Sequence, residues 1–187
     1  MVETPVARRR RWPAPAAALL AVGLLAAMAL SGHVRESRQL VRFVPAGVMP
    51  EEPAEIDRVE LRRGDARWVF ARGLGGWQTV PDGRAAPVAL VTSLDESIKF
   101  MHVSAPIRIM ERSEWDPVGL REFGLDPPGY AAILFRRDAP ALEAEFGAPN
   151  PQKVLQYMKL GGGDRVYLMS RFIGESWESA LREAAAR

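Results

Sequence analysis

A run of 20 residues without a charged side chain, 13–32, follows four consecutive arginines at positions 8–11, with only Trp12 between them. As an α-helix with a rise of about 1.5 Å per residue, the run would span roughly 30 Å, which matches the hydrocarbon core of a bilayer. An excess of arginine on one flank keeps that flank in the cytoplasm. The sequence therefore predicts a cytoplasmic basic tail over 1–12 and a single-pass transmembrane helix over 13–32, with the rest of the chain across the membrane.

One aromatic side chain at the interface and five leucines would hold this helix in the bilayer: Trp12, Leu19, Leu20, Leu24, Leu25 and Leu30. The topology signal would be Arg8, Arg9, Arg10 and Arg11. A cleaved signal peptide is the alternative, because the stretch 27–29, Ala-Met-Ala, has the small-x-small form of a cleavage site. The uncharged run exceeds the ~7–15 residues of a usual signal core, which favours the uncleaved anchor.

Composition excludes several classes of function. The chain contains no cysteine, which rules out disulfides, thiolate metal sites and cysteine nucleophiles. The formal net charge is +2, and residues 1–32 hold four arginines against one glutamate, so the remainder is close to neutral. A nearly neutral domain lacks the basic face that binding to nucleic acid requires. We therefore expect no nucleic-acid partner.

Residues 33–55 predict an extended linker, because Pro45, Pro50 and Pro53 prevent a long helix. The folded domain should then span 56–187. Its first half alternates apolar and polar residues over three short stretches separated by glycine turns, which predicts strands at 56–63, 67–71 and 77–80. The same alternation predicts further strands at 105–110, 130–137, 141–146, 153–160 and 164–170.

Three segments have helical spacing instead. Residues 87–102 repeat apolar residues every three or four positions, 117–123 is a short candidate, and 174–187 places Trp177 and Leu181 one turn apart. Runs of antiparallel strands with a few helices are typical of an α+β fold. We therefore expect an N-terminal transmembrane helix followed by a mostly antiparallel sheet domain with helices packed on one face.

The stretch 123–130, FGLDPPGY, predicts a corner between a helix and a strand. Asp116 is a good N-cap and Pro117 suits the first helical position. Gly124 would take the left-handed conformation that ends a helix, with Leu125 folding back onto Leu120. Two prolines would then prevent the helix from continuing. The predicted structural corner consists of Asp116, Pro117, Gly124, Leu125, Pro127 and Pro128.

No motif supports catalysis. The histidines are His33, beside the predicted membrane segment, and His102, at the end of a predicted helix. Glu111, Glu114 and Asp116 lie close in sequence but match no metal-binding pattern, so a solvated acidic loop is the better interpretation. The glycine-rich stretches GLGG and GGGD lack the context of a phosphate loop. We predict no enzyme activity, no cofactor and no metal site.

The order of motifs resembles the bacterial domain-of-unknown-function 4340 family. The resemblance covers residues 56–170, from EIDRVELRRGDARWVF through GGWQTVP and EFGLDPPGY to QYMKLGGGDRVYLMS. The tyrosine of the family's corner is replaced by Phe123. The resemblance implies a membrane-anchored extracytoplasmic domain associated with transporter or motility components, and it brings no catalytic residues.

Two functions follow as expectations. The first is a non-catalytic, membrane-anchored accessory subunit in the bacterial inner membrane, with its N-terminus cytoplasmic and its C-terminal domain in the periplasm. Its partners would be membrane lipid and a larger integral membrane complex: a transporter, or a respiratory or photosynthetic assembly. The second is a periplasmic module that binds a small molecule or peptide through its aromatic residues Trp77, Trp115, Tyr157 and Tyr167, and a hydrolase is less favoured still.

Overall fold

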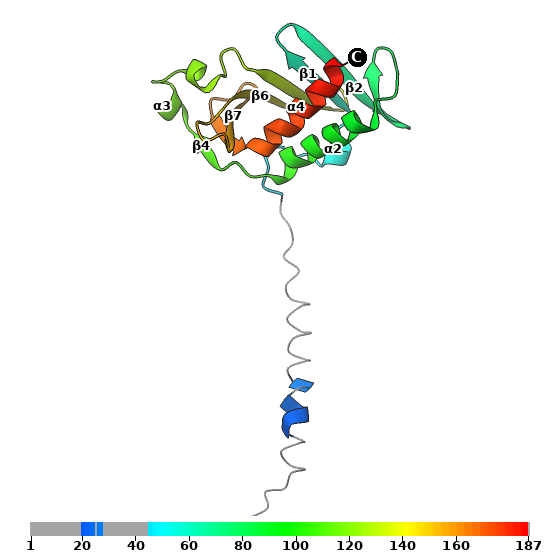
Figure 1. Cartoon of the computed structure of the whole chain (residues 1–187), viewed down its shortest axis with the longest axis vertical. Coiled ribbons are helices and arrows are strands. Elements are labelled where there is room, and N and C mark those ends of the chain that lie inside the picture. The colour runs from blue at the N-terminus through cyan, green and yellow to red at the C-terminus, as the bar shows by residue number, and fades with distance from the viewer. Residues whose placement is uncertain (1–19, 25, 28–44, 187) are drawn as a thin grey trace, which may run out of the picture. The chain divides into compact units, whose positions relative to one another are not determined.

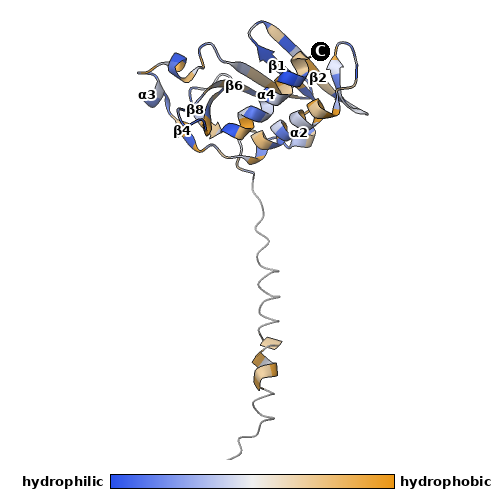
Figure 2. Ribbon diagram, viewed as in Figure 1, coloured by the Kyte–Doolittle hydropathy of each residue, from blue (hydrophilic) through white to orange (hydrophobic). Residues whose placement is uncertain are grey.

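The structure is a computed structural model that describes residues 20–24, 26–27 and 45–186. Residues 20–24 and 26–27 are helical and mostly apolar (Figure 2). Of the predicted anchor residues this includes Leu20 and Leu24, whereas Trp12, Leu19, Leu25 and Leu30 lie outside the described residues, as do the arginines at 8–11. No helix within the described ranges has both the length and the apolar character needed to cross a membrane.

The described residues 45–186 form one compact unit. Its elements, in chain order, are η1 (Pro53–Glu55), β1 (Arg58–Arg63), β2 (Ala66–Gly73), β3 (Gly76–Val80), α2 (Val88–Val103), β4 (Arg108–Met110), α3 (Arg112–Trp115), η2 (Leu120–Phe123), β5 (Tyr130–Arg136), β6 (Ala139–Pro149), β7 (Leu155–Leu160), β8 (Val166–Ser170) and α4 (Arg171–Ala185). Here η marks a short 3-10 helix. The predicted strands and the long helices are all present, and the α+β fold class is confirmed.

All eight strands belong to one sheet, in the order β3-β2-β1-β5-β6-β7-β8-β4, and every neighbouring pair is antiparallel. Helices α2 and α4 lie side by side against one face (Figure 1). A single large apolar core lies between that face and the two helices. From the strands it includes Val59, Leu134, Phe146 and Met158. We refer to this side as the helix face and to the opposite side as the open face.

The two helices reach the sheet through apolar stripes. In α4 the buried residues include Ile173, Trp177 and Leu181, which recur every four residues and so lie on one side of the helix. In α2 the corresponding stripe includes Leu94 and Ile98. The polar contact between the helices is a hydrogen bond from the Ser97 hydroxyl to the Ser176 hydroxyl, at 2.8 Å. The predicted helix faces are therefore correct.

The predicted linker over 33–55 extends too far. Within it, the Gly47 and Met49 amides donate to the carbonyl oxygens of His102 and Met101, at 2.9 and 3.0 Å. Met49 is fully buried in the core. The chain thus packs against the last turn of α2 from residue 47 onwards. The prolines prevented a long helix as expected, but backbone hydrogen bonds to the otherwise unpaired end of α2 hold the segment on the domain.

The helix predicted over 117–123 is wrong in its first half. Glu111 begins the preceding helix α3 through a capping box with Glu114, so Asp116 is the C-cap of α3 rather than an N-cap. Pro117 lies between the two short helices, and Gly119, with φ of 87°, separates them. A left-handed glycine interrupts the helical path, and η2 begins only at Leu120.

The end of the corner is as predicted. Gly124 has φ of 66°, its amide donates to the Arg121 carbonyl, and the Leu125 amide donates to the Leu120 carbonyl at 3.0 Å. These are the two hydrogen bonds of a Schellman motif. Phe123 and Leu125 belong, with Trp115, Met110 and Val166, to a second, smaller apolar core. The corner therefore covers the β7–β8–β4 end of the open face.

Gly124→Ala should lower the free energy of unfolding by about 2 kcal/mol. An alanine must adopt the left-handed conformation, and its Cβ would lie 2.7 Å from the Ala148 amide nitrogen. The matched control is Gly162→Ala, because Gly162 has φ of 70° but no atom within 4 Å of the added Cβ. Urea denaturation of both variants separates the two causes. Equal losses in the two variants would show that the contact with Ala148 contributes nothing.

Candidate functional site

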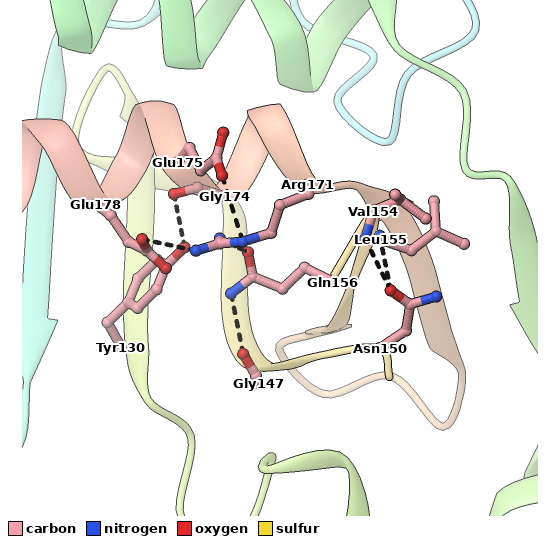
Figure 3. A network of polar contacts seen from close by, with 10 residues as sticks. All are labelled: Tyr130, Gly147, Asn150, Val154, Leu155, Gln156, Arg171, Gly174, Glu175 and Glu178. Carbon is pink, nitrogen blue, oxygen red and sulfur yellow. Dashed lines mark hydrogen bonds and ion pairs between the residues drawn. The ribbon is translucent and has the colours of Figure 1, made fainter. Parts of the chain in front are cut away.

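A network of polar side chains joins the first turns of α4 to the helix face of the sheet (Figure 3). The Arg171 guanidinium donates to Gln156 Oε1 at 2.7 Å and to Glu178 Oε2 at 2.9 Å. Gln156 in turn donates to the Gly147 carbonyl at 2.9 Å. The Tyr130 hydroxyl donates to the Gly174 carbonyl at 2.9 Å. Three strands and one helix are thereby linked through hydrogen bonds that are buried or partly buried.

The protonation states in this network suit structure rather than proton transfer. Burial raises the pKa of the Tyr130 hydroxyl far above its ordinary value, and the nearby Glu178 charge adds to the effect. The hydrogen bond to Glu178 likewise raises the pKa of the Arg171 guanidinium. Both groups therefore keep their protons at any physiological pH, and neither acts as a base. The network fixes the position of the first turns of α4.

A second charged group lies on the open face. The Glu60 carboxylate is only 3% exposed and contacts the guanidinium groups of Arg62 and Arg67, one on each oxygen. Burial has the largest single influence and raises the pKa of Glu60, but the hydrogen bonds and charges of Arg67 and Arg62 together outweigh it. The net pKa lies below the ordinary value of 4.5. The alternating pattern correctly placed the Glu60 side chain on the other face of the strand from Val59 and Leu61, but it did not predict that Glu60 is buried.

Glu60 should make stability depend on pH. A carboxylate with a lowered folded-state pKa contributes stability above its unfolded pKa and loses that contribution as the pH falls through the folded value. We expect Glu60→Gln to melt at a lower temperature than the wild type at pH 7, and the gap to close below about pH 4. Thermal melts followed by circular dichroism from pH 7 to pH 2 measure this difference in melting temperature. Glu143→Gln is the control, because Glu143 is a half-exposed partner of Arg62. A difference in melting temperature between Glu60→Gln and the wild type that does not change with pH contradicts the assignment.

The acidic residues predicted to form a solvated loop are exposed but paired. Glu111 contacts Arg165 at 3.0 Å, Glu114 contacts Arg108 at 2.6 Å, and Asp116 lies 3.9 Å from Arg112. The backbone hydrogen bond from Glu111 and the contact with Arg108 lower the pKa of Glu114. Over the described ranges, no group of three or more histidine, aspartate or glutamate residues is placed to hold a metal ion.

His102 lies in the last turn of α2, as predicted, and is buried. Its Nδ1 is 3.1 Å from the Met49 carbonyl oxygen, and its Nε2 is 3.6 Å from Glu52 Oε2. Both ring nitrogens therefore face the segment that joins the domain at residue 47. His33, the other histidine, lies outside the described residues. His102 therefore connects α2 to the segment that packs on the domain from residue 47 onwards.

The four aromatic residues proposed to line one pocket do not come together. Tyr157 pairs with Leu168 and Tyr167 with Met158, so the two tyrosines point to opposite faces of the sheet. Trp77 belongs to the large core on the helix face, and Trp115 to the small core on the open face. The pocket predicted from these residues is wrong, because neighbouring strands were assigned without a register.

A different set of residues does line a cleft, of about 370 Å³, beside the C-terminal end of α4. Its walls come from β2, from the end of β3 and the turn that follows, and from Ala184 of α4. The lining side chains include two aromatic rings, a hydroxyl and three charged groups: Trp68, Phe70, Thr79, Arg67, Asp82 and Arg84. Sequence reasoning missed this cleft, since Ala184 lies a hundred positions beyond the rest of the lining, which falls within residues 67–84.

The resemblance of residues 56–170 to the domain-of-unknown-function 4340 family stays a prediction. No protein-family model matches the chain, and comparisons with curated proteins and with solved structures find no match either.

Proposed function

We propose that this chain is a non-catalytic accessory subunit of the bacterial inner membrane, anchored by the helix over 13–32. Its N-terminus lies in the cytoplasm, and its α+β domain lies in the periplasm and docks on a larger integral membrane complex, such as a transporter or a respiratory or photosynthetic assembly. The observation that carries the proposal is the N-terminal sequence, in which four arginines precede 20 uncharged residues.

The chemistry of the domain supports a structural role. Its two most buried paired carboxylates are engaged by arginines: Glu60 by Arg62 and Arg67, and Glu178 by Arg171. A carboxylate with a lowered pKa and two guanidinium partners is a poor general base. Such pairs rigidify a domain, and rigidity reduces the entropic cost of docking on a partner.

Affinity purification of the full chain from gently solubilised native membranes tests the proposal. We expect the chain to resist carbonate extraction and to co-purify in fixed ratio with an integral membrane complex. The matched control carries a cleavable export signal in place of residues 1–32, which releases the same domain into the periplasm. If both forms run alone at monomer size, the docking role is wrong.

The cleft beside α4 favours one alternative, a module that binds a small molecule or peptide. Its volume lies at the lower end of the roughly 300–1,000 Å³ typical of ligand sites, and it combines aromatic walls with a few polar groups. Under this alternative an envelope metabolite should raise the melting temperature of the wild type but not of Trp68→Ala. Screening without any such shift leaves the accessory role as the preferred function.

A further inference from the structure

Four large apolar side chains are exposed around the first turn of α4. Ile107 and Val154 are each 62% exposed, Ile109 is 43% exposed and Phe172 is 47% exposed. We call this group, together with the partly buried Phe100, the α4 pole. Its members come from five separate places in the chain: the end of α2, the segment before β4, β4 itself, the turn before β7, and α4.

Contacts and register bring these residues to one end of the helix face. The Phe172 ring packs edge-on against the Phe100 ring, with centroids 5.0 Å apart. Val154 is adjacent because its carbonyl oxygen accepts from the Arg171 amide at 2.9 Å.

Ile109 pairs with Tyr167, whose side chain points to the helix face, and Ile107 lies two residues earlier and so on the same face. The network around Arg171 and Gln156 fixes the turn of α4 that carries Phe172 (Figure 3). The four exposed side chains therefore lie around a rigid framework.

The incoming chain joins the domain at this same pole. The amides of Gly47 and Met49 bond to the last carbonyls of α2, and Phe100 belongs to the same final turn. Between the uncharged run, which ends at residue 32, and residue 45, where the described part of the domain begins, lie only 12 residues. Even fully extended, 12 residues span at most about 43 Å.

Two exposed lysines stand beside apolar residues of the pole. Lys153 and Lys99 directly precede Val154 and Phe100, whereas Arg108 points to the open face and pairs with Glu114, and Arg171 is engaged by Gln156 and Glu178. Apolar side chains flanked by lysines suit the boundary between anionic headgroups and acyl chains. The acidic neighbours on the same side include Glu52, which faces His102, and Glu175 and Glu178, which both face Arg171.

We propose that the α4 pole rests on the surface of the bilayer, with Ile107, Val154 and Phe172 inserted among the headgroups of anionic lipids. The inference depends on the membrane anchor of the proposed function, because the short connection keeps the pole at high local concentration near the bilayer. The contact orients the domain, so that the ends of the sheet away from the pole face the periplasm.

Because the chain has no cysteine, a single fluorophore can be attached through one introduced cysteine. We would label Val154→Cys and, as a matched control, Val88→Cys in the full chain, reconstituted in vesicles of phosphatidylethanolamine and phosphatidylglycerol. Val88 is 82% exposed, but it lies at the opposite end of α2 from the pole. The label at 154 should emit at shorter wavelength and be quenched by nitroxide lipids. The label at 88 should be quenched by aqueous iodide.

Equal accessibility of both labels to iodide would overturn the inference. A label at 154 that is exposed in pure lipid vesicles but shielded in native membranes would also overturn it, since the pole would then cover a protein. Carbonate extraction of the same vesicles separates the two proposals. If the chain stays bound while the label at 154 remains aqueous, only the lipid contact fails; if the chain is released, the anchor and the proposed function fail with it.

Discussion

Gly174→Ala should lower the free energy of unfolding by about 3 kcal/mol or more. Gly174 lies near the start of α4, and an added Cβ would overlap Gln156 Oε1 and lie 2.7 Å from its Cδ. Gln156 is buried and cannot move away without losing its hydrogen bonds to Gly147 and Arg171. The added methyl group must therefore displace α4 or break the network.

A double-mutant cycle with Gln156→Ala tests this cause. Once the side chain at 156 is removed, an alanine at 174 should cost nothing, or stabilise by up to about 1 kcal/mol, because alanine is the better helix former. Urea denaturation of the four proteins gives the coupling energy. If Gly174→Ala is as damaging in the Gln156→Ala background as in the wild type, contact with Gln156 is not the reason for a glycine at this position.

The sequence predicted the elements of this fold better than their relations. Alternation at Val59 and Leu61, and the helical spacing of Leu94 and Ile98, reflect a simple physical rule, in which one face of each element is buried. Eight strands and the two long helices follow from it. The rule carries no information on strand order, and β1 pairs with β5 across a long stretch of intervening chain.

The misplaced site residues have two physical causes. Tyr157 and Tyr167 were named together as residues of a possible binding module, but the side on which each points depends on the register. Asp116 was expected to begin a helix, but the capping box of Glu111 and Glu114 has its N-cap five residues upstream and begins an earlier helix. In each case the local preference of the residue was identified correctly, but a competing contact decided where its side chain lies or what it caps.

Gly124 and Leu125 show the opposite outcome. A Schellman stop is formed by hydrogen bonds within six residues, so the sequence contains all the information that it needs. The tertiary role of the corner was not predictable in the same way. Phe123 packs against Tyr157, with ring centroids 4.8 Å apart, and that contact joins residues 34 positions apart to cover the open face.

Trp177→Ala should lower the free energy of unfolding by about 3–5 kcal/mol. Trp177 is fully buried in the large core, on the stripe of α4 that packs against α2 and the sheet. Truncation leaves a cavity that the surrounding strands and helices cannot fill, because the buried network holds α4 in place. Thermal and urea denaturation of the secreted or refolded domain, monitored by circular dichroism, measure the loss in the free energy of unfolding.

Trp177→Phe separates the packing of the ring from its polar atom. The Trp177 indole nitrogen is buried with no hydrogen-bond partner among the described residues, so phenylalanine removes an unsatisfied donor while filling most of the space. Trp77 is the matched control, because its indole nitrogen donates to Asp95 at 2.9 Å and its ring lies beneath the Arg72 guanidinium. We expect Trp77→Phe to cost at least about 1 kcal/mol more than Trp177→Phe, since it loses that hydrogen bond. Equal costs at the two positions would mean that the Trp177 nitrogen has a partner after all, and that α4 is held at its centre by a polar contact as well as by packing.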